Sequence, residues 1–458
     1  MGIDNILHLY KEMYYSLPQS VKTFLGTIYG NIPLEIRFGN VYSKQLEIVE
    51  KYENATDQFK LDFLYNKTLE TITFAEKYIP YYKKIFQEYG VSASSFKDLK
   101  DIEKFPYLTK DDIKQNLQDM YVDIIEKPTP YFTGGSTSSP TKYYLPLHTS
   151  RAKEKAYNNF IFSKIGYKYR DRTVLLKGRD VANIDKKIFW EYEPVDNYLV
   201  VSNSYLNSEY FMLIYNKISS FKPKFFFGYP SAVIEFIKVA KKLNVIIPNI
   251  KGVILASEMI FEDELKLIKD YFDCDIIIHY GHTERAVIAY NKNNVGYKFL
   301  NSYGLSRIVD NEIVVTGFDN FVMPFINYKT NDYTSDEVKF LPGTDVSYWA
   351  NNIEGRLQEY LVTKDKRLIS ICVMGAGHYS SLSTVDAIQY KQDKIGVVTL
   401  LVESKKRIDK ESIKEQLESF CKKAIKFQIK QVDYIPKSSR GKRIMCKQSL
   451  NIQKFRNV

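Results

Sequence analysis

The sequence predicts an α/β protein with a large N-terminal domain of mixed and parallel sheets and helices, followed by a small C-terminal α+β domain. Three observations support this fold class. The chain has 458 residues, enough for two or three folding units. Between about residues 173 and 326, short apolar runs alternate with helical patterns, which is typical of a largely parallel sheet. After "NNIEGRLQEY" the pattern changes, so we expect domains at 1–355 and 356–458.

The first predicted elements are helices, from Ser43 to about Met120, so residues up to about 120 form a helical lead-in. The stretch "LTKDDIKQNLQDM" begins with Thr109 as a candidate N-cap and has Asp112 three residues later. This spacing is typical of a capping box.

Five apolar runs in the next part of the chain are predicted strands: "TVLLKG", "PKFFFGYP", "IKGVILAS", "CDIIIHYG" and "NEIVVTGF". Two stretches between them, "SAVIEFIKVAKKL" and "FEDELKLIKDYF", carry apolar residues at helical spacing. In the C-terminal domain we expect strands near Leu368 and Val397 and a helix after Asp409. The apolar face of that helix would consist of Ile413, Leu417, Phe420 and Ala424.

Composition argues against several classes of protein. The first twenty residues lack the pattern of a secretory signal, and apolar runs such as Ile395 to Val402 are too short to span a bilayer. The four cysteines form no CxxC pair, which predicts neither disulfides nor zinc and fits a reducing cytoplasm. The net charge of +11 could indicate nucleic-acid binding, but lysines are spread along the chain among acidic residues. We therefore expect a cytoplasmic protein with no membrane insertion and no nucleic-acid partner.

The stretch "YFTGGSTSSPTKYY", from Tyr131 to Tyr144, is rich in glycine and hydroxyl side chains. Such loops let backbone N–H groups converge on phosphate oxygens, and the hydroxyl groups add donors. No GK[ST] ends the run, so the Walker pattern is absent. By composition alone, a flexible surface loop is an equally good interpretation.

A second stretch, "IIIHYGHTERAVIAY", places Tyr280, Gly281, Thr283 and Glu284 directly after a strand that we expect to be buried. Ligands gather at the carboxyl ends of strands in open α/β sheets. A ring that can stack on a base, a hydroxyl for phosphate and a carboxylate for Mg2+ lie together here.

Further candidates follow downstream. "INYKTNDYT" supplies Asp332, a candidate ribose ligand, and "EGRLQEY" supplies Arg356. In "PKSSRGKR", Gly441 leaves the backbone flexible, and Lys442 offers a mobile ammonium that can bridge carboxylate and phosphate oxygens. The alternative for Lys442 is a solvated lysine in a basic tail.

In this order the motifs resemble those of the adenylate-forming superfamily of acyl- and aryl-coenzyme A ligases, luciferases and peptide-synthetase adenylation domains. "TGGSTSSP" is similar to its phosphate loop, "YGHTE" to its adenine and magnesium motif, and "YKTND" to its ribose aspartate. "EGR" resembles the segment before its hinge and "PKSSRGK" its catalytic-lysine loop. Four N-terminal stretches resemble the phenylacetate-CoA-ligase-like branch, specifically its capsular polysaccharide biosynthesis (CapK-like) members: "AEKYIPYYKKIF", "FPYLTKDDIKQN", "FWEYEP" and "FFFGYPSAV".

The resemblance, which covers nearly the whole chain, implies ATP-dependent activation of a carboxylic acid between a large domain and a mobile C-terminal lid domain. A small acyl or amino acid would become an acyl-adenylate with release of pyrophosphate, and would then pass to a thiol or amine. ATP and Mg2+ are the implied cofactors. The acceptor would be coenzyme A, a carrier-protein thiol or an amino sugar, and the pathway surface polysaccharide biosynthesis.

The resemblance also implies roles in handling the phosphates. The β- and γ-phosphates would be held by Thr133, Gly134, Gly135, Ser136 and Thr137. Three residues would be catalytic: Glu284 through Mg2+, Thr283 at the α-phosphate, and Lys442 at the transferred phosphoryl group.

On the nucleoside side, Tyr280 would stack on adenine beside Gly281, and Asp332 with Arg356 would hold the ribose. Two further residues, Ser257 and Glu258, would line the adenine side, although such a pair at a strand end more often caps a helix.

The acid pocket would lie at "GYPS" and beside the strand end. Its wall would include Gly228, Tyr229 and Pro230, which could also form an ordinary turn after a buried strand. We place His282 in this pocket as a neighbour of the site rather than a base, because the chemistry does not require one.

Three departures from the family pattern bear on activity. Ser138 replaces a glycine that is usual in the phosphate loop, and Gln358 occupies the hinge position, where Asp or Lys is common. The segment after Arg356 lacks the Arg-Gly pair of many relatives. These departures motivate an alternative, a non-catalytic nucleotide-binding or assembly protein that retains the fold.

Overall fold

The computed structural model describes residues 3–4, 11–132, 141–176, 181, 183, 185–206, 208–257, 260, 262–334, 349–353, 360–371, 385, 387–436, 446–450 and 452–455. Contacts divide the chain into two units. The larger comprises Met1–Tyr131 and Tyr143–Glu354, and the smaller comprises Phe132–Lys142 and Gly355–Val458. Each unit has a hydrophobic core of its own.

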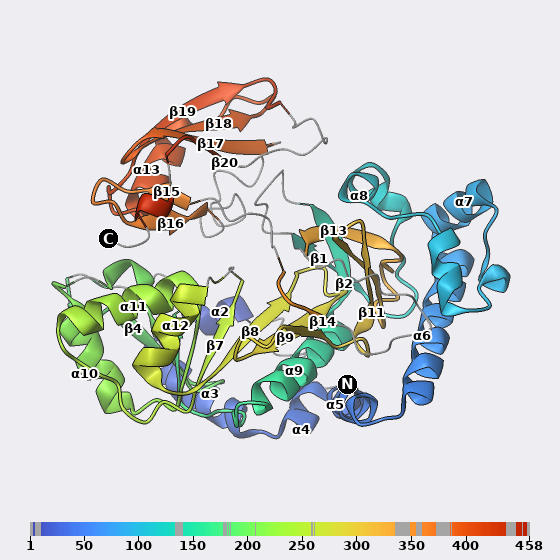
Figure 1. Cartoon of the computed structure of the whole chain (residues 1–458), viewed down its shortest axis with the longest axis horizontal. Coiled ribbons are helices and arrows are strands. Elements are labelled where there is room, and N and C mark those ends of the chain that lie inside the picture. The colour runs from blue at the N-terminus through green and yellow to red at the C-terminus, as the bar shows by residue number, and fades with distance from the viewer. Residues whose placement is uncertain are drawn as a thin grey trace. The chain divides into compact units, whose positions relative to one another are not determined.

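A nine-stranded sheet is the centre of the larger unit (Figure 1). In spatial order its strands are β14 (Trp349–Ala350), β10 (Tyr297–Phe299), β9 (Ile288–Lys292), β8 (Asp275–Gly281), β7 (Gly252–Ala256), β6 (Phe225–Gly228), β3 (Thr173–Leu176), β5 (Tyr198–Val201) and β4 (Trp190–Glu193). The central strands β5, β3, β6, β7 and β8 run parallel, and the flanking pairs are antiparallel. This arrangement confirms the predicted α/β class.

Helices cover both faces of this sheet (Figure 1). Because side chains alternate along a strand, Phe226 and Val253 point to one face and Phe225 and Ile254 to the other. The first face packs on α10 (Phe211–Phe221), α11 (Pro230–Lys242) and α12 (Glu262–Phe272). The second face packs on α9 (Leu147–Ser163).

A separate antiparallel sheet consists of β11 (Gly304–Val309), β12 (Glu312–Gly317) and β13 (Tyr328–Tyr333). The run "NEIVVTGF" is a strand, as predicted, but it belongs to this sheet and not to the largely parallel one. Asp310 and Asn311 both have left-handed backbone angles, with φ of 50° and 62°. Such a two-residue turn joins strands as a hairpin, which makes the β11–β12 pair antiparallel.

The predicted helical lead-in is confirmed. Its helices are α2 (Lys11–Ser16), α3 (Gln19–Asn31), α4 (Leu34–Phe38), α5 (Asn40–Glu53), α6 (Asp57–Tyr78), α7 (Pro80–Tyr89) and α8 (Lys110–Asn116), with short 3-10 turns at Ala93–Ser95, Leu99–Lys104 and Leu117–Asp119. The capping box at the start of α8 is also confirmed. Thr109 Oγ1 accepts from the Asp112 N–H at 3.2 Å, and Asp112 Oδ2 accepts from the Thr109 N–H at 2.8 Å. A two-stranded sheet of β1 (Pro128–Phe132) and β2 (Lys142–Pro146) follows.

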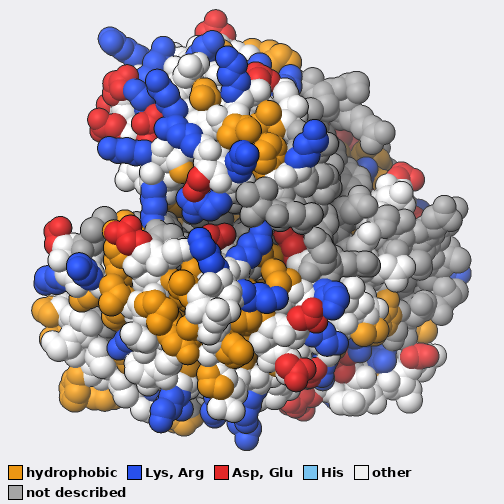
Figure 2. Space-filling view, turned by 60° about the vertical axis from the view of Figure 1, so that its left-hand side comes forward, with side chains coloured by type: hydrophobic (Ala, Val, Ile, Leu, Met, Phe, Trp, Pro, Cys, Tyr) orange, Lys and Arg blue, Asp and Glu red, His pale blue; other side chains and the backbone are white. Residues whose placement is uncertain are grey.

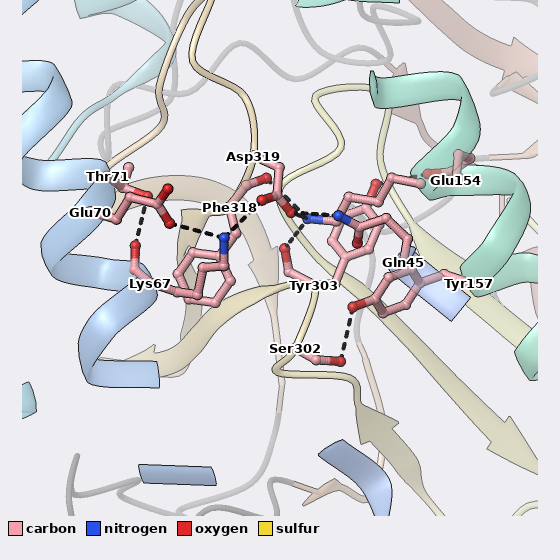
Figure 3. A network of polar contacts seen from close by, with 11 residues as sticks. Gln45, Lys67, Glu70, Thr71, Glu154, Tyr157, Ser302, Tyr303, Phe318 and Asp319 are labelled. Carbon is pink, nitrogen blue, oxygen red and sulfur yellow. Dashed lines mark hydrogen bonds and ion pairs between the residues drawn. The ribbon is translucent and has the colours of Figure 1, made fainter. Parts of the chain in front are cut away.

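A partly buried polar network ties the lead-in helices to the second sheet (Figure 3). Asp319, which follows β12, accepts hydrogen bonds from Gln45 of α5 at 3.1 Å and Lys67 of α6 at 3.2 Å. Lys153 of α9 donates to the same carboxylate at 3.0 Å and to the carbonyl oxygen of Tyr303 at 2.7 Å. Burial opposes the charge on Asp319, but Lys153 and Lys67 outweigh it and lower the pKa of this carboxyl.

The described residues of the smaller unit form two sheets and one α-helix. Its hairpin consists of β15 (Tyr360–Val362) and β16 (Leu368–Ser370), and its four-stranded sheet runs in the order β19 (Lys426–Val432), β18 (Val397–Glu403), β17 (Ala387–Lys394) and β20 (Cys446–Gln448). Helix α13 (Lys410–Phe420) follows Asp409, whose side chain accepts from the Ser412 N–H at 3.1 Å. Both strand predictions and the helix prediction are confirmed. Ala424, however, lies beyond the helix, because Lys422 and Lys423 turn left-handed with φ of 50° and 58°.

Within the described part of the chain, none of the helices combines the length and the apolar character needed to cross a bilayer. Figure 2 shows lysine and arginine side chains spread over both units, with acidic and apolar side chains between them. The positive charge on this face is therefore dispersed rather than gathered in one patch.

Gly304 at the start of β11 tests how tightly the second sheet packs on the turn after β8. A Cβ atom at this position would lie 2.3 Å from the carbonyl oxygen of Ala286 and 3.0 Å from that of Thr316. We expect Gly304→Ala to lower the free energy of unfolding by about 1–3 kcal/mol, the usual cost of overpacking. Urea unfolding measures this change.

Gly90→Ala is the matched control, because a Cβ atom there would meet nothing within 4 Å. The substitution should cost only the strain of its left-handed φ of 64°, about 1–2 kcal/mol. Equal stability of Gly304→Ala and the unchanged protein would contradict the close packing.

Candidate active site

The carboxyl ends of the parallel strands β6, β7 and β8 bring several predicted site residues to one edge of the nine-stranded sheet. Gly228 ends β6, Ser257 follows β7, and Gly281 ends β8. The chain then turns, with the Arg285 N–H donating to the carbonyl oxygen of His282 at 3.0 Å. This turn contains Thr283, which is exposed, and Glu284, which is buried.

Glu284 lies among three partners that come from different parts of the larger unit. The Tyr328 hydroxyl donates to its Oε1 at 2.8 Å, and Lys110 Nζ lies 3.9 Å from the same oxygen. His282 Nδ1 lies 3.3 Å from the other oxygen, Oε2. Only 4% of Glu284 is exposed, so these partners replace water around the carboxylate.

These partners decide the charge of Glu284. Burial raises the pKa of a carboxyl, but the close approach of His282, the positive charge of Lys110 and the hydrogen bond from Tyr328 outweigh it. The pKa of Glu284 is therefore lowered from its usual value of 4.5. The site holds an ionised carboxylate at neutral pH.

Tyr280 and Asp332, predicted as nucleoside ligands from motifs far apart in the sequence, lie together. The Tyr280 hydroxyl donates to Asp332 Oδ2 at 2.8 Å. Burial and the neighbouring charge of Asp332 raise the pKa of Tyr280 well above 10, so the hydroxyl stays protonated and remains a donor. The Tyr280 ring meets Tyr297 and Phe299 edge-on, at centroid distances of 6.5 Å and 6.3 Å. These contacts fix the orientation of the ring.

His282 lies beside the Tyr328 ring at a centroid distance of 6.2 Å, with 13% of its side chain exposed. Its Nε2 has no hydrogen-bond partner among the described residues. This nitrogen could therefore bind a polar group of a ligand at the strand end.

The structure places the predicted wall of the acid pocket at the start of α11. Gly228 leaves no room for a side chain, since a Cβ atom would lie 2.7 Å from the carbonyl oxygen of Leu176. The Tyr229 N–H donates to that same carbonyl at 3.0 Å, and Pro230 is the first residue of the helix. Tyr229 remains half-buried at the edge where the neighbouring strands end.

Ser257 has a left-handed backbone with φ of 71° and is exposed. Helix α12 begins at Glu262, so Ser257 does not immediately precede it as an N-cap would. The following predicted site residues lie outside the described residues: Thr133, Gly134, Gly135, Ser136, Thr137, Ser138, Glu258, Arg356, Gln358 and Lys442.

Sequence reasoning missed two partners of Glu284. Tyr328 stands in the "YKTND" stretch, so that motif was itself a signal of a site residue. Lys110 carried no local signal beyond its place at the start of a helix. Its ammonium also donates to the Thr330 carbonyl at 3.2 Å, which links α8 to β13.

The donor set suits a magnesium ion better than a transition metal. Across the described residues, no group of three or more His, Cys, Asp or Glu side chains could hold a metal ion by itself. Mg2+ keeps several waters and takes one or two carboxylates plus substrate phosphates. The ionised carboxylate of Glu284 has the ligand type and charge that Mg2+ takes, whereas zinc needs several protein ligands. Because Tyr328 and Lys110 lie at Oε1 and His282 lies at Oε2, an ion would have to displace one of them.

Comparison with known proteins identifies relatives of the whole chain. No protein-family model matches it. Protein CapK of Staphylococcus aureus is 23% identical over 457 residues, which cover 94% of this chain and 97% of that protein.

Among solved structures, 2-hydroxyisobutyryl-CoA ligase with 2-HIB-AMP and CoA, in the thioesterification state, matches with a TM-score of 0.57 at 14% identity. The match covers 89% of this chain and 93% of that chain. The same ligase in the postadenylation state with R3-HIB-AMP matches with a TM-score of 0.53 at 13% identity, over 89% and 94% of the two chains. At these identities the likeness shows the fold, and the predicted fold class is confirmed.

Glu284→Gln tests the ionised state of this carboxyl through the pH dependence of stability. Because the folded pKa lies below the unfolded value near 4.5, ionisation stabilises the protein above that pH, and the contribution is lost as pH falls through the folded pKa. We expect the substitution to lower the urea midpoint most at pH 7 and progressively less toward pH 3.5.

The control is Glu47→Gln, which removes an exposed carboxylate on α5 and should change the midpoint little at either pH. A midpoint difference for Glu284→Gln that is the same at pH 7 and pH 3.5 would show that its ionisation contributes nothing.

Proposed function

We propose that this chain, a homologue of Protein CapK with the fold of the adenylate-forming ligases, activates a small carboxylic acid with ATP. One observation carries the proposal: an ionised Glu284 follows β8, the strand that also contains Tyr280, and the Tyr280 hydroxyl donates to Asp332. Together they offer a metal-binding carboxylate, an aromatic ring and a ribose-binding carboxylate at the edge where α/β sheets bind ligands.

In the first step, an oxygen of the substrate carboxylate attacks the α-phosphorus of ATP. The bond from that phosphorus to the leaving oxygen breaks, so pyrophosphate departs and an acyl-adenylate remains. The protein contributes positioning and charge stabilisation rather than covalent chemistry. Mg2+ bound at Glu284 would supply positive charge to the phosphate oxygens. Lys110 and Tyr328 would keep the Glu284 carboxylate ionised and correctly oriented.

The nucleoside would be held by the pair that the structure brings together. Asp332 has a second carboxylate oxygen beside the one that accepts from Tyr280, and carboxylates are suited to bind ribose hydroxyls. Tyr280 would present its ring to adenine, and Thr283, exposed in the turn, would contact the α-phosphate. From their sequence motifs alone, we propose that Arg356 binds the ribose and that residues 133–137 bind the β- and γ-phosphates.

The acid would bind near His282 and Tyr229. His282 Nε2 is a hydrogen-bonding atom without a partner among the described residues, and substrate carboxylate or hydroxyl groups can occupy such a position. Ser257 and Glu258 would line the adenine side of the same edge.

In the second step, a thiol sulfur or amine nitrogen attacks the acyl carbon, AMP leaves, and the acceptor loses a proton to solvent. Coenzyme A, a carrier-protein thiol and an amino sugar are the acceptors that we consider. The solved ligase of this fold binds CoA, which supports a thiol acceptor. A role in surface polysaccharide biosynthesis is our proposal, based on the resemblance to CapK-like proteins. Rotation of the C-terminal domain about Gln358 would separate the two steps. We place the reaction in the cytoplasm, where ATP is available.

Pyrophosphate release from ATP and Mg2+, across amino acids, hydroxy acids, aryl acids and short fatty acids, tests the proposal. We expect release that depends on one acid class. Lys442→Ala should slow it by about 10²–10³-fold, the usual loss when one stabilising charge is removed.

Lys447→Ala is the matched control, because Lys447 is an exposed lysine of β20 close to Lys442 in the sequence. Its rate should equal that of the unchanged protein. Tight ATP binding without pyrophosphate release from any acid would instead support the non-catalytic nucleotide-binding alternative. An unchanged rate in a folded Lys442→Ala variant would exclude the proposed role of this lysine.

A further inference from the structure

A cavity of about 200 Å³, open to solvent on one side, lies among the lead-in helices, outside the candidate active site. Its walls come from α5, α6, the segment that precedes α9 and the loop that follows β12. This volume can hold one small aromatic ring, since an apolar cavity of about 150 Å³ binds benzene. The walls are mainly apolar and include Val41, Ile48, Pro146 and Val322, with the exposed Ile125 at the rim.

Most polar groups that line the cavity are already engaged within the protein. Asp319 accepts from Lys67, Gln45 and Lys153, as Figure 3 shows for the first two. Glu126 accepts from the Thr149 hydroxyl at 3.0 Å and from the backbone N–H groups of His148 and Thr149, so it caps the start of α9. Neither acid is left to bind a cationic ligand.

Two neighbouring residues of α5, Lys44 and Gln45, have polar groups without a partner among the described residues. Gln45 is only 5% exposed and donates to Asp319 through Nε2, but its Oε1 has no hydrogen-bond partner in the described part of the chain. A buried acceptor of this kind costs free energy until a donor reaches it. Lys44, which also lines the cavity, is exposed and forms no ion pair with any described residue.

We propose that this cavity is a second ligand site, which takes a small apolar molecule carrying one anionic group, such as an aliphatic or aromatic acid. The anionic group would lie against Lys44 and the apolar body against Val41, Ile48 and Val322. A hydroxyl or N–H of the ligand would satisfy Gln45 Oε1 after a small shift of the side chain. The site does not depend on the proposed function, because none of its residues belongs to the strand end that carries Glu284.

The fluorescent probe 8-anilinonaphthalene-1-sulfonate tests this site, since it combines an apolar aromatic body with one sulfonate and an N–H donor. Titration into the full chain, without ATP or acid, should give a saturable rise in fluorescence. Lys44→Glu should weaken binding about tenfold or more, because it replaces attraction by repulsion at the anionic group. Val41→Trp should abolish binding by filling the cavity.

Two controls keep the test decisive. Lys51→Glu changes the charge of a lysine two turns further along α5 that does not line the cavity, and should leave affinity unchanged. Near-ultraviolet circular dichroism checks that Val41→Trp is folded. If that variant is unfolded, Lys44→Glu still tests the site, because Lys44 is exposed and its substitution should not disturb the fold. Absence of saturable binding, or equal affinity in Lys44→Glu and Lys51→Glu, would overturn the proposal whatever the outcome of the pyrophosphate assay.

Discussion

The larger unit depends on one partly buried carboxylate, Asp319, which three helices share. Gln45 of α5, Lys67 of α6 and Lys153 of α9 all donate to it. Only 3% of Lys153 is exposed, and burial lowers its pKa while Asp319 opposes that change. A buried ammonium without its counter-ion costs about 3–5 kcal/mol, so the helices and the loop after β12 are held as one assembly.

That assembly positions the candidate site because α9 also covers one face of the nine-stranded sheet. Arg285, which follows Glu284, donates to Ser150 of α9 at 2.6 Å. Glu284 itself follows β8, whereas its partner Tyr328 belongs to β13 and Lys110 to α8. The partners that keep the buried Glu284 ionised therefore meet only when the two sheets and the lead-in helices are correctly packed. The low pKa of Glu284 depends on the packing of the whole unit, because that packing brings its partners together.

Local patterns predicted the elements well and their long-range partners less well. The capping box at Thr109 and the helix after Asp409 rest on neighbouring residues, which a sequence displays directly. The sequence "NEIVVTGF" also predicted a strand, β12. A two-residue turn at Asp310 and Asn311 pairs it with β11, so it lies in a different sheet from the parallel strands. At the site, motif order indicated Tyr280 and Asp332, whereas Lys110 was missed because helix periodicity says nothing about which distant carboxylate a lysine meets. The roles of Arg356 and Lys442 still rest on motifs alone.

The central claim is that a nucleotide binds where Tyr280 and Asp332 meet, and calorimetric titration of ATP with Mg2+ tests it most directly. Asp332→Ala removes the carboxylate and should weaken binding at least about tenfold, the effect of losing one charged hydrogen-bonding group. Asp62→Ala, at an exposed position on α6, provides the reference for a general loss of negative charge. Equal ATP affinity in the two variants would contradict the account, because the nucleotide would then bind elsewhere.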